Sequence, residues 1–165
     1  MMDSIIREDI EQIKRSIDPE AFRGKSLLVS GGSGFLGSWI CDVLTQIESR
    51  VICLDNLSTG VFENVEHLKG TKGFEFERGD VCTYSKNPKV DFVFHLASSP
   101  APEDYPKHPV ETALANSEGT KQMLELAQIH DSRVRFASSS EAYVTQRCFR
   151  LQSRMNARRS STSEN

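Results

Sequence analysis

The sequence predicts an α/β fold built on a doubly wound parallel sheet. Short apolar segments that suit strands alternate with longer segments whose apolar residues recur at helical spacing. The strand-like segments are apolar at consecutive positions, which is typical of strands covered by helices on both faces. A glycine cluster, GGSGFLG at 31–37, separates the first of these strands from the helix that follows it. Together these observations favour an alternating strand–helix order over an all-helical or antiparallel fold.

The elements can be assigned in chain order. Asp3 is expected to cap an amphipathic helix that ends before Pro19, and its apolar stripe is Ile5, Ile6, Ile10, Ile13 and Ile17. Strands are expected at 26–30, 51–55, 74–81, 90–99 and 134–140, and further helices at 35–47 and 107–130. From Thr145 onward neither the strand period nor the helical period is present, so this segment is expected to be poorly ordered.

Composition narrows the class of protein. A length of 165 residues with 38% apolar and 26% charged residues indicates one soluble globular domain. No apolar run is long enough to span a membrane, and the N-terminus alternates charge with isoleucine, unlike a signal peptide. We therefore expect a cytoplasmic protein that binds no membrane. The four cysteines (41, 53, 82 and 148) have no Cys-x-x-Cys spacing, so free thiols and no metal site are expected.

The charges are unevenly distributed. The net charge is −3, yet residues 145–165 hold five arginines and one glutamate. The body of the chain is therefore acidic and the last segment basic. Phe149 is the single aromatic residue among these arginines, which is poor support for the interleaving of basic and aromatic residues that nucleic-acid binding favours, so no nucleic-acid partner is expected.

The glycine cluster predicts a dinucleotide site. Glycines between a strand and a helix allow a tight turn, a close backbone approach to a pyrophosphate, and close packing of the helix on the strand. The helix N-terminus then offers N–H groups and a partial positive charge to the phosphates. Asp55 ends the second strand, 18 residues past Gly37, where a carboxylate would accept hydrogen bonds from the adenosine ribose and repel a 2′-phosphate. This favours NAD over NADP; the alternative is an ordinary strand-to-helix turn.

Several motifs in order resemble one enzyme family. They are VSGGSGFLGSWICDVL, VICLDNLSTG, RGDV, VDFVFHLAS, NSEGTKQMLELA and SSSEAY. Together they resemble the extended short-chain dehydrogenase/reductase family, and within it the NAD-dependent nucleotide-sugar epimerases, dehydratases and decarboxylases. The resemblance covers roughly residues 25–143. The segment PAPEDYPKHPVETALAN is most similar to UDP-glucuronate decarboxylases and related dTDP-glucose dehydratases. The resemblance implies a Rossmann fold and NAD as cofactor.

The resemblance also assigns roles to individual residues. It implies pyrophosphate contacts by Gly31, Gly34, Phe35, Leu36 and Gly37, and adenosine-ribose contacts by Asp55 and Asn56, with Ser58, Thr59 and Gly60 nearby. It places Asp80 and Val81 beside the adenine, and Leu96, Ala97, Ser98 and Thr112 along the cofactor toward the nicotinamide. It matches Ser139 to the catalytic serine or threonine and Glu141 to an acid of the dehydratase and decarboxylase branches.

Some of these residues also have purely structural interpretations. Asp80 could cap a turn, and residues 138–140 could be a polar strand end. His95 lies inside an apolar run and is interpreted as a packed core histidine rather than a ligand.

One motif of the resembled family is absent from this sequence. The family's chemistry is a transient hydride transfer to NAD, and it uses a Tyr-x-x-x-Lys pair whose lysine lowers the pKa of the tyrosine. The three tyrosines, Tyr84, Tyr105 and Tyr143, are followed four residues later by Pro88, Pro109 and Arg147. The second domain, which grips the nucleotide sugar in that family, is also not found here. We therefore expect the cofactor-binding half of an enzyme.

The expected organisation has three parts. A helical extension covers residues 1–24, a NAD-binding Rossmann domain covers 25–144, and a basic tail covers 145–165. The composition of the tail is typical of out-of-frame reading or of sequence beyond a splice or deletion junction; the alternative is a genuine disordered tail.

Two functional hypotheses follow. The first is a truncated nucleotide-sugar enzyme that binds NAD but does not turn over, with a nucleotide sugar as partner only when the missing domain is supplied. The second is a non-catalytic NAD-binding sensor or subunit. Both are compatible with a homo-oligomer.

Overall fold

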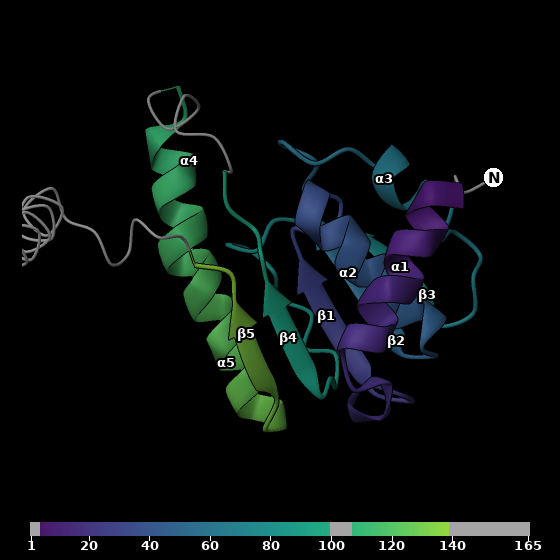
Figure 1. The fold of residues 1–165 in the computed structure, drawn as a ribbon. Helices are drawn as coiled ribbons and strands as arrows, with labels where there is room; N and C mark the ends of the chain where they lie inside the picture. Colours follow the sequence, from purple (N-terminus) through teal and green to yellow (C-terminus); the bar gives the residue numbers. More distant parts are fainter. Residues whose placement is uncertain (1–3, 100–106, 139–165) are drawn as a thin grey trace, which may run out of the picture.

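A five-stranded, all-parallel sheet forms the centre of the computed structural model, which describes residues 4–99 and 107–138. The strand order is β3-β2-β1-β4-β5, so the chain builds outward from β1 in one direction, returns, and continues in the other (Figure 1). The strands are β1 (Ser26–Ser30), β2 (Arg50–Asp55), β3 (Phe74–Arg78), β4 (Phe92–His95) and β5 (Arg133–Phe136). This topology confirms the predicted doubly wound α/β fold.

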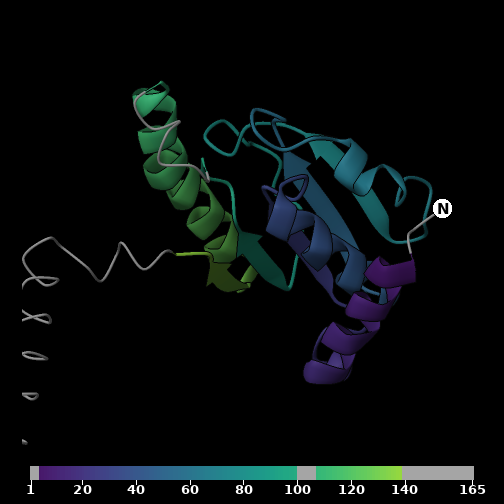
Figure 2. The same ribbon diagram turned by 45° about the horizontal axis from the view of Figure 1, so that its top comes forward.

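Helices cover the sheet on its two faces because alternate residues of each buried strand point in opposite directions. One core layer places Leu27, Val29 and Val51 against α2 (Phe35–Gln46). The other places Leu28 and Val93 against α5 (Thr120–His130). Figures 1 and 2 show α1 and α2 on one side of the sheet and the α4–α5 helix on the other. Consecutive apolar residues in β1 therefore serve two cores, as the sequence predicted.

Two strands, β3 and β4, are shorter than the segments predicted for them, 74–81 and 90–99. β3 ends at Arg78, before Asp80, and the Gly79 N–H makes one more hydrogen bond to β2, at the Asp55 carbonyl. β4 ends at His95, and the next residues turn toward the glycine loop. The sequence pattern could not show the end of β4 because apolar residues, Leu96 and Ala97, continue past it.

The long helix expected at 107–130 contains a π-helical turn. It runs as α4 (Pro109–Leu114), a π segment (Ala115–Gly119) and α5. Gly119 lies in this segment, and a Cβ there would stand 2.6 Å from Cγ2 of Val81. The absence of a side chain at Gly119 thus allows the helix to approach the loop after β3. A one-residue insertion of this kind leaves no clear mark in the periodicity.

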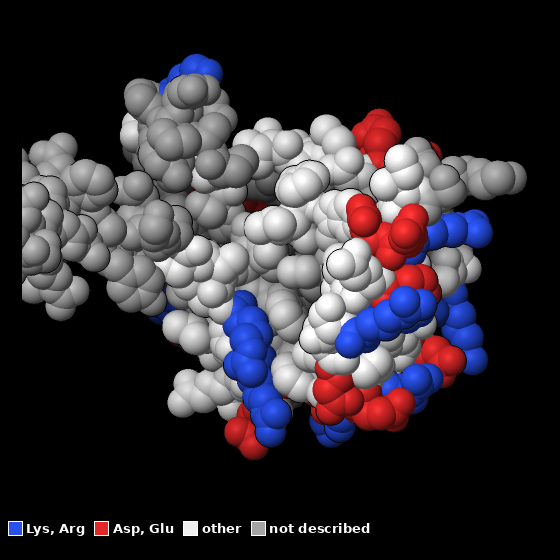
Figure 3. Space-filling model, viewed as in Figure 1, with Lys and Arg blue, Asp and Glu red and all other residues white. Residues whose placement is uncertain are grey.

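The N-terminal helix α1 (Ser4–Ser16) packs beside α2. Ile10 is fully buried, whereas Ile5 and Ile13 are exposed, so the isoleucine stripe is only partly covered. Figure 3 shows acidic and basic side chains of both signs crowded over this part of the surface. The predicted capping residue Asp3 lies outside the described residues.

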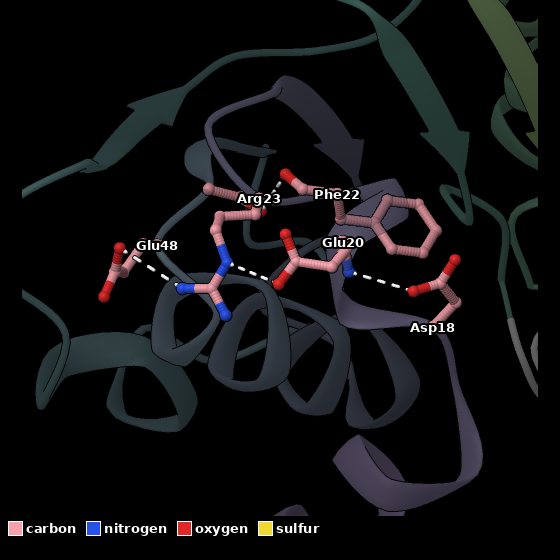
Figure 4. Close-up of polar contacts among 6 residues, drawn as sticks. Asp18, Glu20, Phe22, Arg23 and Glu48 are labelled. Carbon is pink, nitrogen blue, oxygen red and sulfur yellow. Dashed lines mark hydrogen bonds and ion pairs between the residues drawn. The ribbon is translucent and has the colours of Figure 1, made fainter.

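A polar junction connects α1 to the sheet (Figure 4). Asp18 accepts a hydrogen bond from the Glu20 N–H at 3.1 Å and caps a short 3₁₀ turn, Pro19–Ala21. Arg23 pairs with Glu20 at 2.9 Å and with Glu48 at 3.4 Å. These exposed pairs contribute little stability individually, but they hold the turn before β1 against the turn before β2.

A short helix that was not expected from the sequence, α3 (Glu63–Glu66), lies between β2 and β3. Within the described residues, no helix has the length and apolar character needed to cross a membrane. The predictions for Ser139, Glu141 and the tail 145–165 lie outside the described residues.

Candidate dinucleotide-binding site

The carboxyl ends of β1 and β4 meet where the strand order reverses, which is where open parallel sheets place their ligands. Gly31 follows β1 with φ of +72°, a left-handed conformation that glycine adopts without strain. A Cβ at Gly31 would also stand 2.8 Å from the Ala97 nitrogen and from the Leu96 carbonyl carbon. Conformation and space both require glycine here, and the residues following β4 are thereby brought against the glycine loop.

The glycine loop ends at the N-terminus of α2. Gly34 is the N-cap residue in an extended conformation, and no side chain caps the first turn. Gly37 packs so closely on the Gly31 carbonyl that a Cβ would overlap it. Phe35 and Leu36 project outward, 77% and 62% exposed, although both are large and apolar. The first-turn N–H groups of an uncapped helix make a site that suits an anion such as a pyrophosphate.

Asp55 ends β2 beside this loop and is only 7% exposed. Its two carboxylate oxygens accept hydrogen bonds from the Ser33 N–H at 2.9 Å and the Leu57 N–H at 2.8 Å. Each oxygen of an ionised carboxylate can accept a second hydrogen bond, so a ribose contact remains compatible with this arrangement. The carboxylate therefore also holds the glycine loop against β2, a task that sequence reasoning did not assign to it.

Asn56 and Asp80 contact each other across the loops that follow β2 and β3. The Asn56 amide donates to Asp80 at 3.0 Å, and the Cys82 N–H donates to the other Asp80 oxygen at 2.8 Å. Partial burial alone would raise the pKa of Asp80, but the hydrogen bonds from Cys82 and Asn56 outweigh it and lower that pKa below its ordinary value. The turn-capping geometry considered for Asp80 is thus present, and a contact with adenine stays a prediction.

The segment after β2 folds back over the glycine loop. Gly60 lies against it, with its Cβ position 2.9 Å from the Ser33 carbonyl carbon. The Ser33 carbonyl accepts hydrogen bonds from the Val61 N–H at 3.2 Å and from the Asn64 amide at 2.8 Å. Ser58 and Thr59 are exposed on the same segment. Sequence reasoning missed Asn64 because it lies beyond the recognised DNLSTG motif.

The remaining predicted cofactor residues are distributed around the same edge. Val81 is buried and packs on Gly119 of the π-helical turn. Ala97 is partly buried and Ser98 is exposed after β4. Thr112 lies on α4, where its hydroxyl donates to the His108 carbonyl at 2.7 Å. The roles assigned to these residues stay predictions.

His95 is a core residue, as expected. It is buried at the end of β4, with Nδ1 2.6 Å from the Ser30 hydroxyl and Nε2 3.1 Å from the Thr120 hydroxyl. Because the Thr120 hydroxyl donates to the Asn116 carbonyl, its oxygen is left to accept from Nε2–H, and Nδ1 accepts from Ser30. Burial lowers the pKa of His95 below its ordinary value, which favours this neutral form.

Comparison with a family model accounts for this arrangement. The model of the NAD dependent epimerase/dehydratase family matches residues 27–153. The chain belongs to that family. The match contains the glycine loop, Asp55 and the segment that follows β5, and it also takes in residues 145–153 of the segment predicted as a tail.

Curated relatives within the family share substantial identity with this chain. UDP-glucuronic acid decarboxylase 1 of Xenopus tropicalis is 37% identical over 146 residues, which cover 84% of this chain and 34% of that protein. The enzyme of the same name from Danio rerio is 40% identical over 119 residues, covering 72% of this chain and 28% of that protein. The chain thus spans about a third of the length of these relatives.

Solved structures of family members have the same fold. The epimerase Mth375 of Methanothermobacter thermautotrophicus superposes with a TM-score of 0.65 at 29% identity, covering 83% of this chain and 39% of that one. UDP-glucose 4-epimerase from Brucella ovis, solved in complex with NAD, gives a TM-score of 0.59 at 26% identity over 73% of this chain and 38% of that one. The family's cofactor is NAD.

Proposed function

We propose that this chain binds NAD at the switch point between β1 and β4, as the cofactor-binding part of a nucleotide-sugar epimerase, dehydratase or decarboxylase. The observation that carries the proposal is the glycine loop itself, in which Gly31 and Gly37 occupy positions where a Cβ would collide with backbone. Such a loop places the uncapped N-terminus of α2 where a pyrophosphate can approach the backbone. The relatives' names favour UDP-glucuronate as the nucleotide sugar.

The residues of the site would divide the dinucleotide among them. The N–H groups at the start of α2 would hold the pyrophosphate, and Asp55 would accept hydrogen bonds from the adenosine ribose. Bound NAD would supply the acceptor for a hydride from the sugar. Leu96, Ala97 and Ser98 would line the path toward the nicotinamide end of the cofactor. The enzyme is proposed to be cytoplasmic.

The direct test is titration of the full 165-residue chain with NAD and with NADP. We expect NAD to bind more tightly, because the Asp55 carboxylate would meet the 2′-phosphate of NADP with like charge. Isothermal titration calorimetry at matched ionic strength gives both affinities. Equal or tighter NADP binding would contradict the ribose assignment, and no binding of either would contradict the proposal as a whole.

The same chain is proposed to be unable to turn over by itself. Ser139 can polarise a sugar hydroxyl and Glu141 can take part in proton transfer, but no tyrosine of the sequence is followed four residues later by lysine. Loss of a general base typically costs about 10²–10⁴-fold in rate. NAD-loaded protein would be incubated with UDP-glucuronate, UDP-glucose or dTDP-glucose and the products separated by chromatography. Product that disappears in Ser139→Ala would show that another residue, with Tyr143 the first to test, acts as the base.

The missing Tyr-x-x-x-Lys pattern also supports a second candidate, a non-catalytic NAD-binding sensor or subunit, which is compatible with assembly as a homo-oligomer. The two candidates differ in what the encoding nucleotide sequence contains after codon 144. A neighbouring reading frame that encodes Tyr-x-x-x-Lys and a second domain favours the nucleotide-sugar enzyme. A stable isolated chain with micromolar NAD affinity and no such frame favours the sensor.

A further inference from the structure

Ser33 is the point at which the glycine loop is held from two sides. It is fully buried in the middle of the loop. Its N–H donates to Asp55 at 2.9 Å. Its carbonyl accepts two hydrogen bonds, from the Val61 N–H at 3.2 Å and the Asn64 amide at 2.8 Å. Both peptide units that meet at Ser33 are therefore oriented by groups outside the loop.

The two donors to the Ser33 carbonyl belong to residues 57–67, which we call the strap. The strap begins at Leu57, whose N–H donates to Asp55 at 2.8 Å. It crosses the glycine loop at Gly60 and ends at His67, whose Nε2 lies 2.6 Å from Oδ1 of Asp42 on α2. The strap is thus attached at one end to the end of β2 and at the other to α2, the helix that follows the glycine loop.

The carbonyl of Ser33 and the N–H of Gly34 belong to one planar peptide unit, so they turn together. With the carbonyl held by the strap, the Gly34 N–H donates inward to the Gly31 carbonyl at 3.1 Å. If that peptide rotated, the carbonyl oxygen would leave its two donors and could turn toward the start of α2. A carbonyl dipole there would repel a phosphate that the N–H groups of the helix attract.

We propose that Asn64 is a positioning residue for the dinucleotide site, acting through the Ser33 carbonyl to hold the glycine loop in its phosphate-binding shape. Asn64 has no expected contact with the cofactor. Its side-chain amide supplies a hydrogen bond to this carbonyl that a substitution can remove without altering the backbone, unlike the bond from the Val61 N–H. The inference rests on the proposed NAD binding for its effect on affinity, but not for its effect on the loop.

Two variants separate the donor from the rest of the side chain. Asn64→Ala removes the amide, and Asn64→Asp keeps its shape but places a carboxylate oxygen beside the carbonyl. Asn87→Asp, at an exposed position between β3 and β4, controls for the change of charge. Hydrogen exchange of residues 31–38 in the NAD-free chain reports the loop. We expect on the order of tenfold faster exchange there in Asn64→Ala, more in Asn64→Asp, and no change in Asn87→Asp.

A pH profile distinguishes positioning from a general loss of packing. A carboxyl group can donate a hydrogen bond only when it is protonated, and a nearby carbonyl oxygen raises its pKa. Asn64→Asp should therefore regain loop protection and NAD affinity, relative to the unaltered chain at the same pH, as the pH falls from 7 toward 4.5. Asn64→Ala should show no such recovery. At neutral pH, both variants should bind NAD roughly tenfold more weakly.

The outcomes separate this inference from the proposed function. If the unaltered chain does not bind NAD, the proposed function fails, while hydrogen exchange still decides whether Asn64 holds the loop. Unchanged exchange at 31–38 in both Asn64 variants would overturn the inference. Faster exchange with undiminished NAD affinity would overturn it as well, because the loop shape would then not matter for binding.

Discussion

Asp55 shows at the residue scale how one side chain can serve both structure and recognition. Its carboxylate holds Ser33 and Leu57 through their N–H groups, and the same carboxylate is the group proposed to accept hydrogen bonds from the adenosine ribose. His95 is the contrasting case, because all its polar contacts are internal and its burial favours the neutral ring.

Replacing Asp55 with Ala should therefore change stability and cofactor preference together. Two backbone N–H groups would lose a charged acceptor, which corresponds to a loss of about 2–4 kcal/mol in the free energy of unfolding. NAD affinity should fall and its advantage over NADP should narrow. Urea denaturation and calorimetric titration measure the two effects. An unfolding free energy equal to that of the unaltered chain would contradict the hydrogen-bonding role.

His95 should make stability depend on pH below neutrality. Its pKa in the folded state is lowered from the ordinary value of 6.5 by burial, so the unfolded chain binds the proton more readily. The contribution of neutral His95 to the free energy of unfolding is fully present above pH 6.5. It is lost as the pH falls from there toward the folded-state pKa. We expect the unfolding free energy to decrease between pH 7 and pH 5, and His95→Gln to flatten this decrease.

Asp42 provides an internal check on the sign of that pH dependence. Burial raises its pKa, although the neighbouring His67 opposes the effect. A carboxyl with a raised pKa favours the folded state at low pH and loses that contribution as the pH rises through its folded-state pKa. Asp42→Asn should therefore make the unfolding free energy fall more steeply on acidification, whereas His95→Gln should make it fall less steeply. A slope unaffected by either substitution would show that other groups dominate.

At the scale of elements, the site depends on how closely the start of α2 packs against the end of β1. Gly31 and Gly37 make that contact backbone to backbone. The strap then covers the loop from the opposite side through Ser33. No single element forms the site, which requires β1, β2, β4, α2 and the strap to be in place together.

Gly37→Ala should disrupt this packing more than Gly34→Ala does. A Cβ at Gly37 would overlap the Gly31 carbonyl and stand 2.7 Å from Cα of Gly32, whereas at Gly34 its nearest neighbour is 3.2 Å away. Overpacking against backbone should cost about 3 kcal/mol or more. Thermal unfolding and NAD titration of the two variants give the comparison. Equal losses in both would show that the α2–β1 contact adjusts more freely than its geometry indicates.

At the scale of the whole molecule, the sheet unites two core layers that meet only through their shared strands. The layer on the α2 side and the layer on the α5 side both depend on β1 and β2. Figure 3 shows basic side chains over β5, where Arg133 and Arg135 are exposed. Within the described residues, both faces of the sheet around β1 are therefore covered by helices, and the proposed dinucleotide site lies at the carboxyl end of that strand.

NAD binding should raise the free energy of unfolding of the whole folded chain. A ligand that binds only the folded chain adds about 2.7 kcal/mol at a concentration one hundred times its Kd. For a chain of this size that corresponds to a rise in Tm of about 5–10 °C. Differential scanning calorimetry with NAD, and with NADP at the same concentration, measures the shift. A Tm that does not change with NAD would argue against binding at this site.

The sequence by itself determined the strand–helix order, the glycine loop and the acid at the end of β2, because these depend on local periodicity and on glycines between a strand and a helix. It also identified His95 as a core residue from its apolar neighbours. Only the tertiary structure decided that the Asp55 carboxylate binds the Ser33 N–H, that Asn64 reaches the Ser33 carbonyl, and that a π-helical turn brings Gly119 onto Val81. These contacts join residues 22, 31 and 38 positions apart in the chain. Their distances are set by how strands and helices pack, and no local pattern of residues carries that information.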